Sequence, residues 1–206
     1  MFKLISVTNR RLCGGSFKEQ VERIAKAGIS AVILREKDLE EAQYQELAKQ
    51  IIPICEACSV PCILHTFPKT AKELGQDTIH LPLAKLRENE ELKKLFKTIG
   101  VSVHSVEEAV EAQQLGAAYL TAGHIFATDC KKGLPPRGTG FLRRVVEAVS
   151  IPVYGIGGIT EENAVKIKEA GAAGACIMSS LMTEPFPEKL VYKIQKNITE
   201  CGKNGC

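Results

Sequence analysis

The feature that most constrains the fold of this chain is an alternation of short β-branched segments with longer amphipathic segments, repeated along its length. Parallel strands need a crossover connection, which is usually a helix, so this alternation predicts a parallel sheet. We expect eight strands, at residues 4–8, 31–34, 62–65, 78–81, 98–103, 119–122, 153–156 and 175–178.

Helical spacing fills the intervals between these strands. Several helical segments end in a glycine directly before the next strand, for example at Gly28, Gly116 and Gly171. A glycine there supplies the left-handed residue that ends a helix. The expected helices cover residues 16–27, 40–58, 68–74, 89–95, 106–115, 140–148 and 161–170, with a last helix near 187–194.

The expected fold class is α/β, as a single (β/α)8 TIM barrel. Strands such as 31–34 and 153–156 are apolar on both faces, as the wall of a barrel requires. No linker divides the chain, and eight strands in one uninterrupted unit favour closure over the alternative, an open doubly wound sheet. We expect one barrel domain over residues 1–198 and a flexible C-terminal tail over 199–206.

Charge and hydropathy exclude some classes of function. The 206 residues include 27 Lys and Arg against 24 Asp and Glu, a net charge of +3, and we therefore expect no nucleic-acid partner. No apolar segment is long enough to cross a bilayer, so we expect no membrane contact. The N-terminus lacks the apolar run of a secretory signal, which indicates a cytoplasmic protein.

Part of the cysteine content has the spacing of a metal site. Cys55, Cys58, Cys62 and His65 form a C-x2-C-x3-C-x2-H arrangement, which could bind zinc. We favour ordinary cysteines, because Cys55 and Cys58 close a helix while Cys62 and His65 belong to the next strand. The four side chains then need not converge, although the zinc alternative stays open.

Anion-binding groups follow the last two expected strands. Active sites of such barrels form at the carboxyl ends of the strands, and phosphate commonly binds to the loops after strands seven and eight. The N–H groups of a turn at Gly157 and Gly158 can approach an anion closely. Ser179 and Ser180 open a short helix, whose N-terminus favours phosphate. We predict a phosphate site here, with a merely tight turn as the alternative.

A long polar loop, residues 123–138, follows the sixth expected strand. It places His124 directly at the strand end, where a histidine can act as a general acid or base because its ordinary pKa is near neutral. The alternative is a solvated charged loop. Cys130 in the same loop has no evident pair of catalytic partners and is a weaker candidate.

Two cations follow the second expected strand. Alternation along the strand lets Arg35 and Lys37 share one direction, where they hold an anionic substrate or form salt bridges at the rim. The sequence favours neither interpretation. His80 and His104 are weaker candidates, more typical of packing or of support for other site residues, and Ser105 caps the helix that follows.

These motifs resemble the thiamine phosphate synthase family, to which TenI is related, over nearly the whole chain. The resemblance rests on Leu-Arg-x-Lys at 34–37, Ser-Val-His-Ser at 102–105, Gly-x-Ile-Phe-x-Thr-x-x-Lys at 123–131, Gly-Gly-Ile at 157–159 and Met-Ser-Ser at 178–180. It implies a barrel fold and a homodimer or homotetramer.

Two departures from the synthase pattern concern a magnesium ion. The synthase joins a pyrimidine diphosphate to a thiazole phosphate, and two aspartates hold Mg2+ on the diphosphate. One aspartate follows the third strand and the other lies beyond the fourth, and Thr66 and Lys85 occupy these positions here. Mg2+ prefers oxygen ligands and a lysine would repel it, so the resemblance to the synthase is weakened at this point.

The loop after the sixth strand is similar to that of TenI, because Gly123-His124 replaces the Gly-Pro of the synthase pattern. TenI is a thiazole tautomerase, so the resemblance implies an isomerase that aromatises a carboxythiazole phosphate. His124 would be the catalytic residue that moves the proton, with no metal and no cofactor. The resemblance also implies substrate binding by Arg35, Lys37, Ser102, Thr128 and Lys131, and phosphate binding by Gly157, Gly158, Met178, Ser179 and Ser180.

Two alternatives to the tautomerase stay open. The first is a thiamine phosphate synthase with an altered metal site. The second is a non-catalytic protein that binds thiazole phosphate and regulates a partner. All three hypotheses share a small phosphorylated thiazole as the ligand, and the roles of His65, His104 and Cys130 stay open in each.

Overall fold

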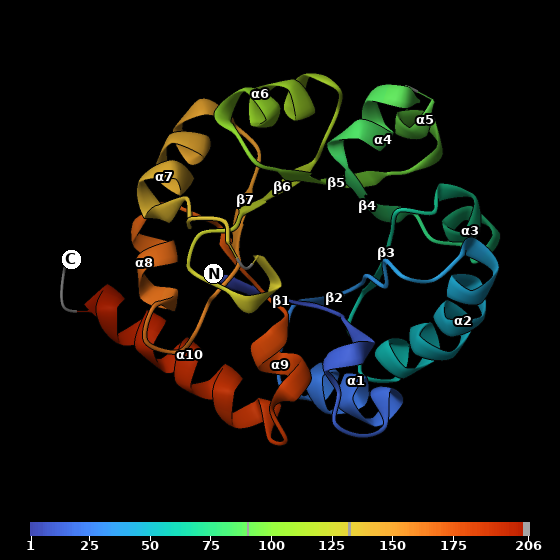
Figure 1. The fold of residues 1–206 in the computed structure, drawn as a ribbon, viewed down its shortest axis with the longest axis horizontal. Coiled ribbons are helices and arrows are strands. Elements are labelled where there is room, and N and C mark those ends of the chain that lie inside the picture. Colours follow the sequence, from blue (N-terminus) through green and yellow to red (C-terminus); the bar gives the residue numbers. More distant parts are fainter. Residues whose placement is uncertain (90, 132, 204–206) are drawn as a thin grey trace.

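The strands close into one parallel barrel in the computed structural model of the chain, which describes residues 1–89, 91–131 and 133–203. Each strand pairs with the next one along the chain, and β8 pairs with β1 (Figure 1). The predicted (β/α)8 barrel is thereby confirmed, and the open sheet is excluded. The strands are β1 Lys3–Val7, β2 Ala31–Leu34, β3 Cys62–His65, β4 Thr78–Pro82, β5 Thr98–Val103, β6 Tyr119–Gly123, β7 Val153–Ile156 and β8 Gly174–Ile177.

Alternation along the strands separates an inner from an outer apolar layer. In β2, Ala31 and Ile33 pack inside the barrel, whereas Val32 and Leu34 belong to the layer beneath the helices. Tyr119 helps to fill the interior, where a Cβ at position 100 would overlap its ring. The inner layer consists of Ile5, Val7, Ala31, Ile33, Ile63, Tyr119, Tyr154 and Cys176.

Helices cover the outside of the barrel all the way round (Figure 1). Serine side chains start two of them, since Ser16 Oγ accepts from the N–H of Glu19 and Ser105 Oγ accepts from the N–H of Glu108. The helices are α1 Phe17–Lys26, α2 Glu41–Ala57, α3 Pro68–Glu73, α4 Leu83–Glu88, α5 Leu92–Leu95, α6 Val106–Gln114, α7 Gly138–Ala148, α8 Ala164–Glu169, α9 Ser179–Thr183 and α10 Pro187–Lys203, with 3-10 turns η1 Arg10–Leu12 and η2 Asp129–Lys131.

The structure differs from the sequence prediction in two helical regions. The helix expected over 89–95 is shorter and consists of α5 alone, while α4 directly before it was not expected from the sequence. Asn89, extended with φ of −150°, separates the two helices. The last helix, α10, reaches Lys203 rather than ending near residue 194. It therefore overlaps the tail expected over 199–206, of which residues 204–206 lie outside the described part of the chain. The flexibility of that tail stays a prediction.

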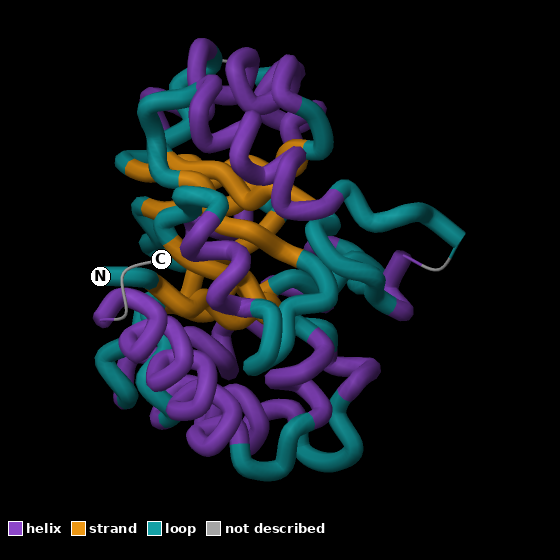
Figure 2. Tube along the Cα trace, turned by 90° about the vertical axis from the view of Figure 1, so that its left-hand side faces the viewer, coloured by secondary structure: helices purple, strands orange, loops and turns teal. Residues whose placement is uncertain are grey.

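The two ends of the barrel are distinct. The N-terminus leads into β1 at one end, while the segment around η2 projects from the opposite end (Figure 2). That opposite end is formed by the carboxyl ends of the strands, where a barrel of this type places its functional residues. Among the described helices, none is both long and apolar enough to cross a bilayer.

Candidate active site

A cavity of about 510 Å³ opens at the carboxyl ends of the strands. This volume lies within the range of about 300–1,000 Å³ that is typical of small-molecule sites. Its apolar floor comes from inward-facing strand residues such as Val7, Ile33, Ile156 and Cys176. Loops after the strands make the walls, so that residues distant in the sequence meet around one space.

A network of polar side chains crosses the floor. Nδ1 of His80 shares a hydrogen bond with the hydroxyl of Tyr119 at 3.1 Å, and Nε2 shares one with Ser102 Oγ at 2.9 Å. The hydroxyl of Thr121 donates to Ser102 Oγ at 3.1 Å. Burial lowers the pKa of His80 to about 3, with Arg35 as a smaller cause, so this histidine is neutral at physiological pH.

His65 lies beside this network at the end of β3. Its ring stacks on that of His80 with centroids 5.5 Å apart, and its Nδ1 shares a hydrogen bond with the hydroxyl of Thr66. Burial, followed by the charges of His80, Arg35 and Lys37, lowers the pKa of His65 well below its ordinary value. The floor therefore presents neutral donors and acceptors rather than charge.

A buried carboxylate fixes the loop after β2. Glu36 accepts hydrogen bonds from the hydroxyl of Thr8 at 2.7 Å and from the backbone N–H of Arg10 at 3.0 Å. Thr8 Oγ1 in turn accepts from the backbone N–H of Arg35 at 2.9 Å. Because Glu36 turns toward the loop after β1, its neighbours Arg35 and Lys37 turn toward the cavity that they line.

The two cations after β2 have no ion pair among the residues that the structure describes. The nearby acids Glu36 and Asp38 pair instead with Arg10, and Asp38 also pairs with Arg11. The rim salt bridges considered as an alternative for Arg35 and Lys37 therefore do not form between these groups. Both cations instead line the cavity.

The loops after β7 and β8 bring small residues to the same cavity. Gly157 and Gly158 have φ of +103° and +64°, and a Cβ at either position would overlap the loop after β6. Met178 precedes α9, and Ser180 Oγ contacts the carbonyl of Ile159 at 3.4 Å. Ser179 Oγ lies 3.8 Å from Cys130 Sγ, so the loop after β6 closes against α9.

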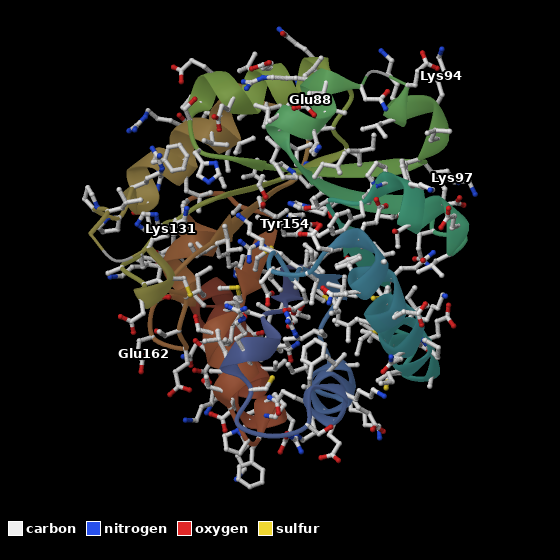
Figure 3. The ribbon with its side chains drawn as sticks, turned by 45° about the vertical axis from the view of Figure 1, so that its right-hand side comes forward. Glu88, Lys94, Lys97, Lys131, Tyr154 and Glu162 are labelled. Carbon is white, nitrogen blue, oxygen red and sulfur yellow. The ribbon has the colours of Figure 1, made fainter. Side chains whose placement is uncertain are left out.

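The loop after β6 lies across the mouth, as its yellow ribbon in Figure 1 shows. Nε2 of the buried His124 donates to the carbonyl of Leu134 at 3.3 Å, and the carbonyl of His124 accepts from the N–H of Arg137 at 3.0 Å. Thr128 accepts from the N–H of Lys131 within η2. Figure 3 labels Lys131 on this loop, to the left of Tyr154 in that view.

The structure brings every predicted site residue to this one cavity. They are His124, Arg35, Lys37, Ser102, Thr128, Lys131, Gly157, Gly158, Met178, Ser179 and Ser180. Sequence reasoning missed Glu36, although its position between two cavity-facing cations was a signal that it faces the other way. It also placed no weight on Arg11, Tyr119 and Thr121, and the last two lie within apolar strands that carry no motif.

The residues at the cavity do not fit a magnesium ion. Thr66 stands where the synthase pattern has one aspartate, and its hydroxyl is bonded to His65. Lys85 stands at the other position, where its ammonium group lies 3.5 Å from Glu88 on the surface of α4. Mg2+ requires several oxygen ligands with carboxylates among them. Asp38 is the one carboxylate that lines the described part of the cavity, and two arginines pair with it.

The zinc arrangement considered from the sequence does not converge either. Cys55 and Cys62 belong to the layer between the barrel and its helices, whereas His65 lines the cavity inside. Within the described ranges, no three His, Cys, Asp or Glu residues form a group that could hold a metal.

The fold and the cavity define a (β/α)8-barrel protein with a small-molecule site at the carboxyl ends of its strands. The chain belongs to the thiamine monophosphate synthase family, whose model matches residues 4–181 and which includes TenI. The thiamine-phosphate synthase of Clostridium acetobutylicum is 36% identical over 188 residues, 88% of each chain. That of Fusobacterium nucleatum is 33% identical over 201 residues, 95% of this chain and 96% of the relative. The solved thiamine phosphate pyrophosphorylase of Pyrococcus furiosus has a TM-score of 0.84 at 29% identity and covers 97% of this chain and 96% of that chain.

These names contradict the prediction of an isomerase. Relatives over nearly the full length are transferases by name, which supports the synthase alternative rather than the thiazole tautomerase. The tautomerase prediction depended on Thr66 and Lys85 replacing the two aspartates and on Gly123-His124 replacing Gly-Pro in the loop after β6. In the structure Nε2 of that histidine is bonded to the carbonyl of Leu134, so its presence has an explanation in how the loop is held.

Proposed function

We propose that this protein is a transferase that joins a pyrimidine diphosphate to a thiazole phosphate and releases diphosphate. The proposal rests on one geometric observation, that two anion-accepting regions open into one cavity. The first comprises Arg35 and Lys37 after β2, and the second comprises the loops after β7 and β8. In the closed barrel these strands flank β1 on its two sides, so both regions are within reach of one reaction centre.

The size and lining of the cavity suit two ring systems. Apolar floor residues such as Ile33 and Ile156 offer surfaces for the flat rings, while Ser102 and Thr121 offer hydroxyl groups for their heteroatoms. Holding both substrates together removes most of the entropic cost of their encounter. The relatives named thiamine-phosphate synthase support this assignment of substrates.

In this reaction the main task of the protein is to stabilise the leaving diphosphate. The carbon–oxygen bond to the diphosphate breaks with its electron pair on the diphosphate, and a ring nitrogen of the thiazole supplies the pair for the new carbon–nitrogen bond. Negative charge therefore accumulates on the departing group. Arg35, Lys37 and Lys131 line the cavity and would stabilise that charge.

The phosphate of the thiazole would bind at the glycine turn. Gly157 and Gly158 keep that turn free of side chains, and Ser179 and Ser180 offer hydroxyl groups beside it. Asn163 holds the turn by donating from Nδ2 to the carbonyl of Gly158 at 2.8 Å. The phosphate would thus anchor the thiazole while its ring reacts.

The direct test is to incubate the full chain with the pyrimidine diphosphate and the thiazole phosphate and to follow thiamine phosphate by chromatography. We expect product, and we expect Arg35→Gln to lower kcat/KM by about tenfold or more, since it removes a charged contact. Lys94→Gln is the matched control, because Lys94 lies on α5 at the outer edge of the molecule (Figure 3). Binding of the thiazole phosphate without any product would overturn the proposal and leave the non-catalytic alternative.

A further inference from the structure

The charges around the cavity are strongly one-sided. Among the described residues that line it, the cationic side chains are Arg11, Arg35, Lys37 and Lys131, and the single carboxylate is Asp38. That carboxylate is already paired with Arg10 at 2.6 Å and with Arg11 at 2.9 Å. Three cations therefore remain without an ion pair in the described part of the chain.

These three cations lie close enough to affect each other. The charge of Arg35 is the largest cause that lowers the pKa of Lys37, with burial and Lys131 as further causes. Burial also lowers the pKa of Arg35 itself, which is half-buried at the end of β2. Like charges at this spacing repel one another, and a bound polyanion would relieve that repulsion.

Hydrogen bonds fix the loop that carries Arg35 and Lys37. Glu36, which is 3% exposed, fixes the loop that carries Arg35 and Lys37 through its bonds to Thr8 and Arg10. The acids of this loop, Glu36 and Asp38, pair with arginines of η1, while Arg35 and Lys37 line the cavity without such pairs in the described part of the chain. Such a division maintains a cationic wall even when no ligand is bound, which is the preorganisation that anion binding needs.

The floor of the cavity is neutral, so a bound anion would be held by Arg35, Lys37 and Lys131. His65 and His80 lie beneath them, and burial holds the pKa of both imidazoles below the ordinary value. Neither histidine can then contribute positive charge, and among the described residues that line the cavity no carboxylate is free to hold a divalent cation. A diphosphate in this cavity would contact side-chain ammonium and guanidinium groups, whereas the synthase pattern provides Mg2+ for the diphosphate.

We infer that this cavity binds the diphosphate of its substrate through Arg35, Lys37 and Lys131 alone, without a divalent metal ion. The inference deepens the proposed function, on which its substrate class rests. An arginine fork can form hydrogen bonds with two phosphate oxygens at once, and the two lysines supply further point charges. The three positive charges take the place of the ion in neutralising the diphosphate.

The test measures binding of inorganic pyrophosphate to the full chain by titration calorimetry, in buffer that contains EDTA. We expect binding without metal, and we expect added Mg2+ to weaken it, because Mg2+ complexes the probe in solution. Replacing Arg35→Gln and Lys37→Gln together should weaken binding by about tenfold or more. Lys94→Gln should bind as the wild type does.

A second variant guards against misfolding. Lys131 is exposed on the loop after β6, so Lys131→Gln should fold normally and still weaken pyrophosphate binding several-fold, by about fivefold. The inference is overturned if pyrophosphate binds only when Mg2+ is present. It is equally overturned if the double variant and Lys131→Gln both bind as tightly as the wild type.

The result is separable from the proposed function. Metal-free binding of pyrophosphate by a protein that forms no thiamine phosphate would overturn the transferase and leave this inference standing. Product formation that stops in EDTA, together with pyrophosphate binding that requires Mg2+, would overturn this inference and leave the transferase standing.

Discussion

The hydroxyl of Thr8 donates a 2.7 Å hydrogen bond to the buried carboxylate of Glu36, across 28 positions of sequence. This bond joins the loop after β1 to the loop after β2, and the same carboxylate accepts from the N–H and the guanidinium of Arg10. One acidic side chain thus holds two loops of the mouth together.

Removing that carboxylate should therefore be costly. Glu36→Ala leaves the hydroxyl of Thr8 and the N–H of Arg10 without their partner, and we expect a loss of about 3 kcal/mol in the free energy of unfolding. Urea unfolding followed by circular dichroism measures it. Glu46→Ala is the control, because the carboxylate of Glu46 forms an exposed pair with Lys49, and its loss should cost less than about 1 kcal/mol. Equal stability of the two variants would show that the network does not hold the loops.

A second prediction concerns the pH dependence of stability. The pKa of His80 is about 3 in the folded protein, below its ordinary value of 6.5. As pH falls below about 6.5, His80 becomes protonated in the unfolded chain but stays neutral in the folded chain. The free energy of unfolding therefore decreases as pH falls. This histidine alone should lower the free energy of unfolding by about 2 kcal/mol between neutral pH and about pH 5.

The variant His80→Gln isolates that contribution. It should lower stability at every pH, since it disturbs bonds to Tyr119 and Ser102. The decline between pH 7 and pH 5 should nevertheless become shallower by about 2 kcal/mol, and His65 would account for a further part that remains. Parallel curves for wild type and variant would mean that folding does not lower the pKa of His80.

The sequence was sufficient to predict the barrel because each βα unit carries its own local signal. Short β-branched segments, helical spacing and glycine helix ends agree with one another, so every strand lies within one residue of its expected bounds. The region of α4 and α5 was less predictable. Apolar residues there recur across both short helices, and the extended backbone of Asn89 that separates them has no marker such as proline.

The site was predictable in its members but not in its contacts. Position at a strand end sufficed to find Arg35, His124 and Gly158, because all strand ends meet at one mouth. Pairing of Glu36 with Thr8 and Arg10 joins segments that only the closed barrel brings together, so no local pattern reveals it. The prediction of the reaction class was wrong because the departures at Thr66, Lys85 and His124 were given more weight than similarity over the whole length.

A third prediction tests the glycine turn. Gly158 has φ of +64°, and a Cβ there would overlap the carbonyl of Ala127 and the side chain of Phe126. Gly158→Ala should weaken binding of thiazole phosphate by about tenfold, because the turn must distort or the loop after β6 must move. Fluorescence or calorimetric titration measures the dissociation constant. Gly15→Ala is the control, since its Cβ would meet no atom within 4 Å. Unchanged affinity in Gly158→Ala would place the phosphate elsewhere.

A fourth prediction concerns the loop after β6. Nε2 of His124 donates to the carbonyl of Leu134, and this bond spans the part of the loop that contains η2. His124→Ala removes it, and the loss of about 1 kcal/mol corresponds to about fivefold more open loop. We expect trypsin to cleave after the exposed Lys131 about fivefold faster in this variant, with cleavage quantified by mass spectrometry.

The control for that prediction is His124→Gln, whose side-chain amide can still donate to the carbonyl of Leu134 and should restore most of the protection. Urea unfolding of both variants separates local opening from a general loss of stability, because His124 is buried and its removal leaves space beside Gly157. If His124→Ala resists trypsin as well as the wild type does, the histidine does not hold the loop.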